Sequence, residues 1–157
     1  MLEENLPPAF LNRDLDDLGC GDGRITLILR DIFQPTRLRG FDVNPILVKR
    51  ARRKGIEAEV RDLSTQMPAG ELAVMWGVLH HLQDREACLK HISENYAMAF
   101  IREPVKNNIR VDLEMGKPLD KQEIEILVQK YFPRARFFYY GNSIFIFTLP
   151  RVDTQPR

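Results

Sequence analysis

The stretch at residues 14–24 reads Asp14-Leu15-Asp16-Asp17-Leu18-Gly19-Cys20-Gly21-Asp22-Gly23-Arg24, and the apolar-rich segment 25–29 follows at once. This order predicts a short strand that ends in a glycine-rich turn and then opens a helix. Such a turn brings backbone N–H groups close to a polar ligand without intervening side chains. Its Gly-x-Gly-x-Gly spacing differs from the Gly-x-Gly-x-x-Gly of dinucleotide-binding folds. We interpret residues 19–23 as a cofactor-binding loop.

Composition sets the broad class of the protein. The chain has 157 residues, 44% hydrophobic and 29% charged, which predicts one domain with a single core. Its formal net charge of +1 gives no overall attraction to nucleic acid or to an anionic membrane. No apolar run approaches the ~18 residues of a membrane span, and acids stand where a signal peptide would be basic. We therefore expect a cytoplasmic protein with no membrane association.

The spacing of apolar residues predicts an α/β fold. Helical spacing recurs in 24–33, 45–54, 84–95 and the segment that opens at Asp120. Strand-like runs occupy 15–18, 38–42, 56–60, 71–77 and 97–101. Two further β-rich runs flank Gly141-Asn142 and predict a hairpin. We therefore expect five βα units followed by an antiparallel hairpin.

The ends of the chain and one internal segment lack clear periodicity. We expect residues 1–13 to be a poorly structured lead-in anchored by Phe10 and Leu11, residues 14–150 to form one domain, and residues 151–157 to be a flexible tail. Residues 105–119 are either a lid over the site or an irregular connection. Asp16 is unusual in a central strand: either it is buried and paired or protonated, or the strand is short.

Two motifs carry a resemblance to a known family. Asp17-Leu18-Gly19-Cys20-Gly21-Asp22-Gly23-Arg24 resembles the first motif of class I S-adenosylmethionine-dependent methyltransferases. Val78-Leu79-His80-His81-Leu82 resembles the Val-Leu-His-His-Leu segment of a branch that includes many small-molecule methyltransferases. The resemblance covers about residues 14–149. It implies a Rossmann-like three-layer αβα sandwich with a mostly parallel seven-stranded sheet and an antiparallel C-terminal hairpin.

The resemblance also implies a reaction and a first set of contacts. The reaction is in-line transfer of a methyl group from S-adenosylmethionine to a nucleophile, which leaves S-adenosylhomocysteine, and it is driven by approximation and desolvation. Gly19, Cys20 and Gly21 are expected to pack against the methionine portion, with Asp17 as the acid of the same motif.

Acids after the second and third predicted strands extend the expected site. Asp42 ends its strand, where a carboxylate can accept hydrogen bonds from ribose hydroxyls, and Val43 is expected beside it. The alternative is an ordinary strand-end aspartate. By resemblance, Asp62 accepts a bond from the adenine amino group and the backbone of Leu63 lies beside the ring. The alternative is a loop aspartate that caps a turn.

The end of the fourth predicted strand is expected to face the reacting group. By resemblance, Trp76 and Gly77 lie beside the sulfonium; the tryptophan either offers a π face to a cation or belongs to the core. His81 is a candidate general base. Adjacent histidines at a helix start point about 100° apart, and with no third ligand we expect no metal. Asn-Pro-Pro-Tyr is absent here, which argues against methylation of amino groups on bases or glutamine.

Two charged segments are explained without a functional role. Residues 49–54, Lys-Arg-Ala-Arg-Arg-Lys, suit a solvated helix end better than a nucleic-acid surface, because no aromatic residues interleave the charges. Arg102 and Glu103 either touch a substrate or pair with neighbours, and we favour pairing.

Three functions remain open from the sequence. The chain is a methyltransferase of a small molecule, the reading that its near-neutral charge and the Val-Leu-His-His-Leu segment favour. Alternatively, it methylates protein or RNA. The argument for this is a lead-in shorter than the family's, which predicts an open site. The substrate, a second copy in a homodimer or a partner chain would complete such a site. The third possibility is a non-catalytic protein that binds the cofactor or a partner, which the same short lead-in and the aspartates of the first strand favour.

Overall fold

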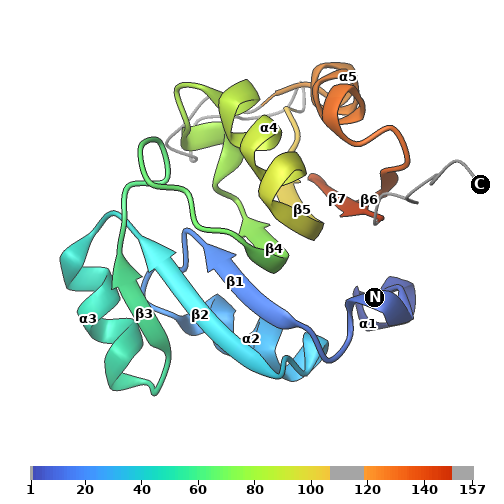
Figure 1. Cartoon of the computed structure of the whole chain (residues 1–157). Helices are drawn as coiled ribbons and strands as arrows, with labels where there is room; N and C mark the ends of the chain where they lie inside the picture. The colour runs from blue at the N-terminus through green and yellow to red at the C-terminus, as the bar shows by residue number, and fades with distance from the viewer. Residues whose placement is uncertain (1, 107–118, 150–157) are drawn as a thin grey trace, which may run out of the picture.

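A seven-stranded sheet forms the centre of the computed structural model, which describes residues 2–106 and 119–149 (Figure 1). The strand order is β3-β2-β1-β4-β5-β7-β6. The strands are β1 (Asp14–Leu18), β2 (Arg37–Asp42), β3 (Glu57–Val60), β4 (Gly70–Trp76), β5 (Tyr96–Pro104), β6 (Arg136–Tyr140) and β7 (Ser143–Thr148). β3, β2, β1, β4 and β5 run parallel, whereas β7 is antiparallel to both β5 and β6. The mostly parallel sheet with a reversed C-terminal hairpin confirms the predicted fold class.

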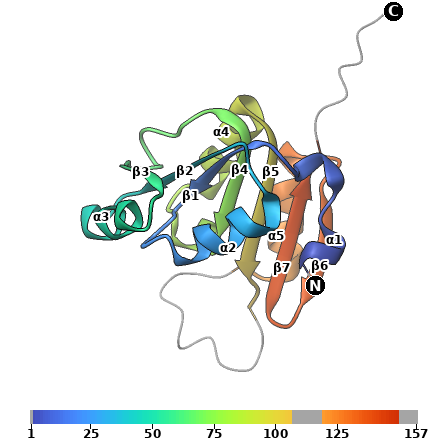
Figure 2. The same ribbon diagram turned by 90° about the horizontal axis from the view of Figure 1, so that it is seen from below.

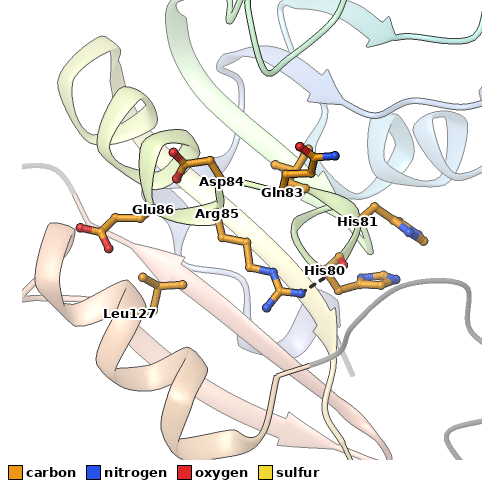
Figure 3. A pocket seen from close by; sticks show the side chains of 8 residues that line it. His80, His81, Gln83, Asp84, Arg85, Glu86 and Leu127 are labelled. Atoms are coloured by element: carbon orange, nitrogen blue, oxygen red, sulfur yellow. Dashed lines mark hydrogen bonds between the residues drawn. The ribbon is translucent and has the colours of Figure 1, made fainter.

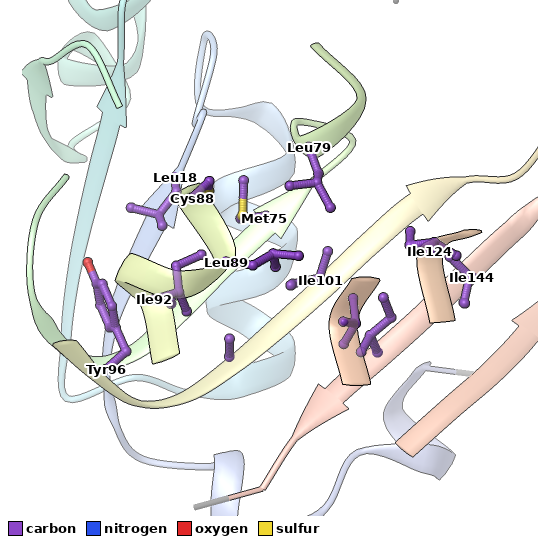
Figure 4. Close-up of a cluster of buried hydrophobic side chains, with 14 of the residues drawn as sticks. Leu18, Met75, Leu79, Cys88, Leu89, Ile92, Tyr96, Ile101, Ile124 and Ile144 are labelled. Atoms are coloured by element: carbon purple, nitrogen blue, oxygen red, sulfur yellow. The ribbon is translucent and has the colours of Figure 1, made fainter. Parts of the chain in front are cut away.

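Helices cover both faces of the sheet and complete the three layers. They are α1 (Leu2–Asn5), α2 (Arg24–Phe33), α3 (Pro45–Arg53), α4 (Arg85–Asn95) and α5 (Lys121–Tyr131), with the 3-10 turns η1 (Pro8–Phe10) and η2 (Leu79–His81). α2 and α3 lie on one face, and α4 and α5 on the other (Figure 2). Leu89 and Ile92 of α4 and Ile124 of α5 pack with Ile101 of β5 in one buried cluster (Figure 4). Phe33 of α2 belongs to a second cluster, on the opposite face.

The connection between β3 and β4 departs from the prediction of five βα units. Residues 61–69 form a turn at 63–65 and extended chain, and no helix follows β3. Ser64 N–H and Oγ–H both donate to Asp62 Oδ1, at 2.9 and 2.6 Å, and this Asx turn occupies the place where a helix would start. Pro68, just before β4, would interrupt any helix that reached it.

Ion pairs lie along β2 and β3, one between the two strands and one at the end of β3. Arg37 pairs with Glu57, and Arg61 pairs with Glu59. The guanidinium of Arg61 also lies 4.9 Å from the centre of the Phe41 ring, which keeps that buried ring away from water.

The lead-in is more ordered than the sequence predicted. Residues 2–5 and 8–10 form α1 and η1, and Leu2 and Phe10 are buried. The Phe10 ring meets Phe147 of β7 edge to face, with centroids 5.5 Å apart. Two apolar anchors against the second cluster therefore hold a segment whose own periodicity is weak. Most of the possible lid at 105–119 and all of the tail at 151–157 lie outside the described residues.

Asp16 proves to be buried and paired. Arg39 binds it in a bidentate manner, Nε to Oδ1 at 2.7 Å and Nη2 to Oδ2 at 2.6 Å. The Tyr96 hydroxyl donates to the same Oδ2 at 2.9 Å. Asp16 on β1, Arg39 on β2 and Tyr96 at the start of β5 form a polar cluster that crosses the sheet. The buried charge is thereby satisfied, and the strand keeps its full length.

Candidate functional site

The cofactor-binding loop is shaped by its contact with the chain after β4. Gly19 has φ of +89°, and a side chain there would begin 2.4 Å from Cγ2 of Val78. The N–H groups of Gly19 and Cys20 both donate to the carbonyl oxygen of Phe41, at 2.7 and 3.0 Å. Gly21 also has positive φ, but nothing lies within 4 Å of the position its Cβ would occupy. The loop is therefore tightly packed at Gly19 and open at Gly21.

Asp42 is held by backbone groups from two loops. The Gly21 N–H donates to its Oδ2 at 2.9 Å, and the Asn44 N–H donates to its Oδ1 at 2.8 Å. Each carboxylate oxygen has further lone pairs, so the group is fixed in position while it can still accept bonds from a ligand. This is the arrangement required of a carboxylate that binds a diol.

The loops that follow β1, β2, β3 and β4 enclose one pocket of about 440 Å³. It lies at the carboxyl ends of the parallel strands, beside the point where strand order reverses between β1 and β4, where ligands bind in open α/β sheets. Most of the site residues expected from the sequence line it: Gly19, Asp42, Val43, Asp62, Leu63, Trp76, Gly77 and His81. Arg61, Val78 and Leu82 complete the lining.

Asp17, Cys20 and Gly21 do not line this pocket. Asp17 is buried beneath the loop, where it accepts a 2.6 Å hydrogen bond from the Thr26 hydroxyl. Burial raises its pKa from 3.8 to about 7, and the nearby charge of Asp42 adds to the shift. Burial also raises the pKa of the Cys20 thiol to about 12, so it stays protonated. The side chains of Asp17 and Cys20 are buried inside the loop, whereas Gly21 has no side chain and lies at its open part.

Trp76 belongs both to the pocket and to the core. Its ring lines the pocket and also meets Phe145 edge to face, with centroids 6.1 Å apart. The guanidinium of Arg102 stands 5.6 Å from the ring centre, and its Nη2 donates to the Ser143 hydroxyl at 2.5 Å. Both interpretations of Trp76 from the sequence therefore describe part of its surroundings.

His80 and His81 do not point apart as expected. Their ring centroids are 3.9 Å apart, because η2 and the contacts of His80 with β5 bring the two rings together. Figure 3 shows them side by side at the edge of a second pocket, of about 680 Å³, which extends to Arg85 and Leu127. His81 and Leu82 line both pockets, which are therefore neighbours. Within the described residues, no group of three potential ligands is arranged for a metal ion.

Glu103 is the site residue whose role the sequence did not reveal. It is 1% exposed, at the end of β5. Its Oε1 accepts the N–H groups of Val78 and Leu79 at 2.8 and 2.7 Å. Its Oε2 accepts His80 Nδ1 at 2.6 Å and the His80 N–H at 3.3 Å. One buried carboxylate thus holds the backbone of residues 78–80, in the loop after β4 that lines both pockets. The only signal in the sequence is an acid at the end of a buried strand.

Comparisons of sequence place the chain among known proteins. A family model described as "Methyltransferase domain" matches residues 17–97, slightly more than half of the chain. Trans-aconitate 2-methyltransferases from Mycobacterium sp. strains KMS and JLS are 32% identical over 63 residues, 40% of this chain. The matched stretch spans a quarter of the length of these curated relatives.

Solved structures share the fold at low sequence identity. The N-terminal domain of EvdMO1 with SAH bound has a TM-score of 0.73 at 15% identity, covering 95% of this chain and 79% of that one. Human N-acetylserotonin methyltransferase in complex with SAM gives 0.75 at 15% identity, covering 96% and 51%. The complex of the Haloferax volcanii Trm112 methyltransferase activator and a putative methyltransferase gives 0.77 at 12% identity, covering 98% and 89%.

The family model begins at Asp17, in the stretch that forms the cofactor-binding loop, and runs through β2, β3, β4 and α4. It therefore includes the carboxyl end of every strand whose following loop lines the first pocket. The sequence motifs, the sheet and these matches agree. This chain belongs to the class I S-adenosylmethionine-dependent methyltransferase family.

Proposed function

We propose that this protein is a methyltransferase that binds S-adenosylmethionine in the 440 Å³ pocket and a small-molecule acceptor in the pocket next to it. The observation that carries the proposal is the convergence of residues from four separate loops around one cavity. Eight of the residues that line it are ones that the sequence predicts for the site. The volume lies within the range of small-molecule sites.

The residues present fit this cofactor. Asp42 is fixed by two backbone N–H groups and has free lone pairs for ribose hydroxyls. Both bonds from Ser64 fall on Oδ1 of Asp62, and they hold the pKa of Asp62 below its usual value, so the group is a charged acceptor for an amino group. The side chain of Val43 is 65% exposed, although it lines the pocket. A ligand there would cover apolar surface that is otherwise left in water.

When bound, S-adenosylmethionine supplies a methyl group on a positively charged sulfur. The protein's own contribution is to position the methyl donor and the acceptor and to exclude water from them. Gly77, with φ of +68° and no side chain, leaves the end of β4 open to the pocket. Trp76 and Leu82 give that region apolar walls, and His81 stands between the two pockets.

A small-molecule acceptor is supported by the second pocket and by the relatives. That pocket is an open depression lined by η2, the start of α4 and Leu127 of α5, and it shares His81 and Leu82 with the first. The Mycobacterium relatives are named for a small molecule, trans-aconitate. One of the two arguments for a non-catalytic protein, the aspartates of the first strand, is weakened, because Asp16 is satisfied by Arg39 and Tyr96. A partner chain over the site stays a proposal, in keeping with the neighbour bound to an activator.

Thermal unfolding with S-adenosylhomocysteine tests the cofactor assignment. At about 100 times its Kd a ligand adds about 2.7 kcal/mol to the free energy of unfolding, so we expect Tm to rise by about 5–10 °C. Asp42→Ala should abolish this shift, since it removes the fixed carboxylate. NADH should give no shift in either protein.

The control variant is Glu57→Ala, which removes an exposed carboxylate on β3 outside the pocket and should keep the full shift. An equal shift in Asp42→Ala and in the wild type would contradict the assignment. Methyl-labelled S-adenosylmethionine offered with metabolite pools, or with protein and RNA, then separates the acceptor classes. Label in protein or RNA alone would exclude the small-molecule proposal.

A further inference from the structure

Arg102 brings a positive charge to the region where the two pockets meet. It is half-buried near the end of β5, where strand register places it beside Trp76 of β4 and Phe145 of β7. Its guanidinium lies 5.6 Å from the centre of the Trp76 ring, and Nη2 donates to the Ser143 hydroxyl at 2.5 Å. The proposed function uses Trp76 but gives Arg102 no task.

No acid forms an ion pair with this guanidinium among the described residues. Successive residues of a strand point to opposite faces of the sheet, so the neighbouring Glu103 points away from Arg102. Both oxygens of Glu103 accept bonds from residues 78–80 instead. Ser143 is a neutral partner, and a guanidinium has several further N–H donors. Contrary to the pairing expected from the sequence, Arg102 therefore keeps a charge and donors that a ligand can use.

The guanidinium borders the space beside Gly77, at the end of β4. A side chain on Gly77 would begin 3.5 Å from Nη1 of Arg102 and 3.7 Å from Cε1 of His80. Gly77 lines the first pocket, and His80 lines the second. The Gly77 N–H also donates to the carbonyl oxygen of Arg102 at 2.7 Å, which fixes the two backbones to each other. The positive charge is thus held where the proposed cofactor and acceptor pockets adjoin.

The other charged groups around the second pocket do not compete for an anion there. Nη2 of Arg85, in α4, donates to the carbonyl oxygen of His80 at 3.3 Å and adds a second positive charge. Asp84 caps α4, and Glu86 forms an ion pair with Lys130 of α5. The acids that line this pocket are therefore engaged with partners of their own, and an anionic group beside Gly77 would meet positive charge.

We propose that Arg102 determines acceptor specificity by binding an anionic oxygen group, a carboxylate or a phosphate, of the molecule to be methylated. This rests on the proposed function. A guanidinium suits either group, because its fixed N–H donors match their oxygen geometry. The Trp76 ring shields one side of the guanidinium from water, which strengthens a charge-assisted bond. The Ser143 hydroxyl fixes Nη2, while Nη1 faces the space beside Gly77.

The single tryptophan of the chain provides a test that needs no known acceptor. Because Trp76 lies close to the Arg102 guanidinium, its fluorescence reports an anion bound there, and the amide NMR signal of Gly77 is a second reporter. In the protein saturated with S-adenosylhomocysteine, we expect succinate or glycerol 3-phosphate to change both signals at constant ionic strength. Their uncharged counterparts, succinamide and glycerol, should not. The anion that binds more tightly identifies carboxylate or phosphate as the preferred group.

Arg102→Met removes the charge and keeps an unbranched apolar side chain over Trp76. We expect it to weaken anion binding by about tenfold or more, since a hydrogen bond to a charged group is lost. The affinity for S-adenosylhomocysteine, measured by calorimetry, should stay within about two-fold of the wild type. Arg102→Lys, which keeps the charge, should retain part of the anion binding. The matched control is Arg30→Met, an exposed arginine of α2 that pairs with Asp31, and it should bind the anions like the wild type.

Turnover tests the acceptor class directly. A metabolite pool is divided on an anion exchanger and each fraction is offered with methyl-labelled S-adenosylmethionine. We expect the acceptor in the retained, anionic fraction, and phosphatase treatment of that fraction separates phosphate from carboxylate acceptors. In Arg102→Met the KM for the acceptor should rise about tenfold or more with a smaller change in kcat, because the lost bond holds substrate and transition state alike.

The outcomes identify which proposal fails. Absence of S-adenosylhomocysteine binding in the wild type would sink the proposed function itself. Binding of S-adenosylhomocysteine with no response to either anion, or with equal anion binding in Arg102→Met and the wild type, would overturn the role of Arg102 alone. An acceptor found only in the unretained fraction would do the same. A loss of S-adenosylhomocysteine affinity in Arg102→Met would assign the arginine to the cofactor instead.

Discussion

Two glycines of the cofactor-binding loop have the same unusual backbone but different surroundings. Both Gly19 and Gly21 have φ in the left-handed region, which disfavours a side chain by roughly 1–2 kcal/mol. Only at Gly19 would that side chain also collide with a neighbour, Val78. A side chain should therefore disturb the loop more at Gly19 than at Gly21.

We predict that Gly19→Ala lowers the free energy of unfolding by about 3 kcal/mol, because strain and overpacking add. Gly21→Ala should cost about 1 kcal/mol, since only strain applies. Urea denaturation measures both values. Val78→Ala introduced into Gly19→Ala should recover part of the loss, and equal losses for the two glycines would contradict this account.

Asp17 gives the stability a specific dependence on pH. Its pKa is about 7 in the folded protein and 3.8 as the ordinary value, so the folded state binds the proton more tightly. Its stabilising contribution is fully present below about pH 4 and is lost as pH rises through about 7. Between pH 4 and pH 8 the wild type should lose about 4 kcal/mol that Asp17→Asn does not lose. Urea denaturation across this range measures the difference.

The asparagine can still accept the hydrogen bond from Thr26, so the contact is preserved while the titration is removed. Asp31→Asn, an exposed carboxylate on α2, is the control and should follow the wild-type pH profile. Parallel profiles for Asp17→Asn and the wild type would show that Asp17 does not titrate in this range.

Among the elements, α3 starts shortly after Asp42, the residue that we propose to bind the ribose. Asn44 caps it, its side chain accepting from Ile46 N–H at 2.9 Å and Leu47 N–H at 3.3 Å, with Pro45 at the first helical position. The bond from Asn44 to Asp42 comes from the backbone rather than the side chain. The helix cap and the pocket are thus separable by mutation.

Asn44→Ala should therefore lower the free energy of unfolding by about 1 kcal/mol and leave the affinity for S-adenosylhomocysteine unchanged. Chemical denaturation and calorimetry measure the two quantities. Asn44→Asp, which keeps a capping acceptor, should be close to wild type in both. A matching loss of affinity in Asn44→Ala would show that the cap also positions the site.

Across the whole molecule, the cluster of Asp16, Arg39 and Tyr96 connects three strands of the sheet. Asp16→Ala leaves the Tyr96 hydroxyl without its acceptor and Arg39, which is 25% exposed, without its partner. We expect a loss of about 2 kcal/mol in the free energy of unfolding, less than for a fully buried pair because water reaches Arg39.

The triple variant Asp16→Leu, Arg39→Met and Tyr96→Phe should be more stable than Asp16→Ala, because no polar group is then left unpaired. Guanidinium denaturation ranks the variants. A triple variant less stable than Asp16→Ala would contradict this account. It would show that the cluster stabilises the fold beyond supplying hydrogen-bond partners to its own three side chains.

The sequence by itself determined the order of elements and the glycine-rich loop between β1 and α2. Apolar periodicity is a local signal, and the helices and strands that it predicts are found within a few residues of the expected ends. The site positions at the ends of β2, β3 and β4 also followed, because parallel strands bring their carboxyl ends to one edge.

Only the tertiary structure decided which polar groups meet. Asp16 finds Arg39 and Tyr96 across the sheet, and Glu103 finds the η2 turn, through contacts between residues far apart in the chain. The order of the lead-in likewise depends on tertiary contacts, because Leu2 and Phe10 pack into the second cluster. Local periodicity reports which face of an element is apolar. The partner of a buried charge depends on strand order and register, which are set by packing of the whole chain.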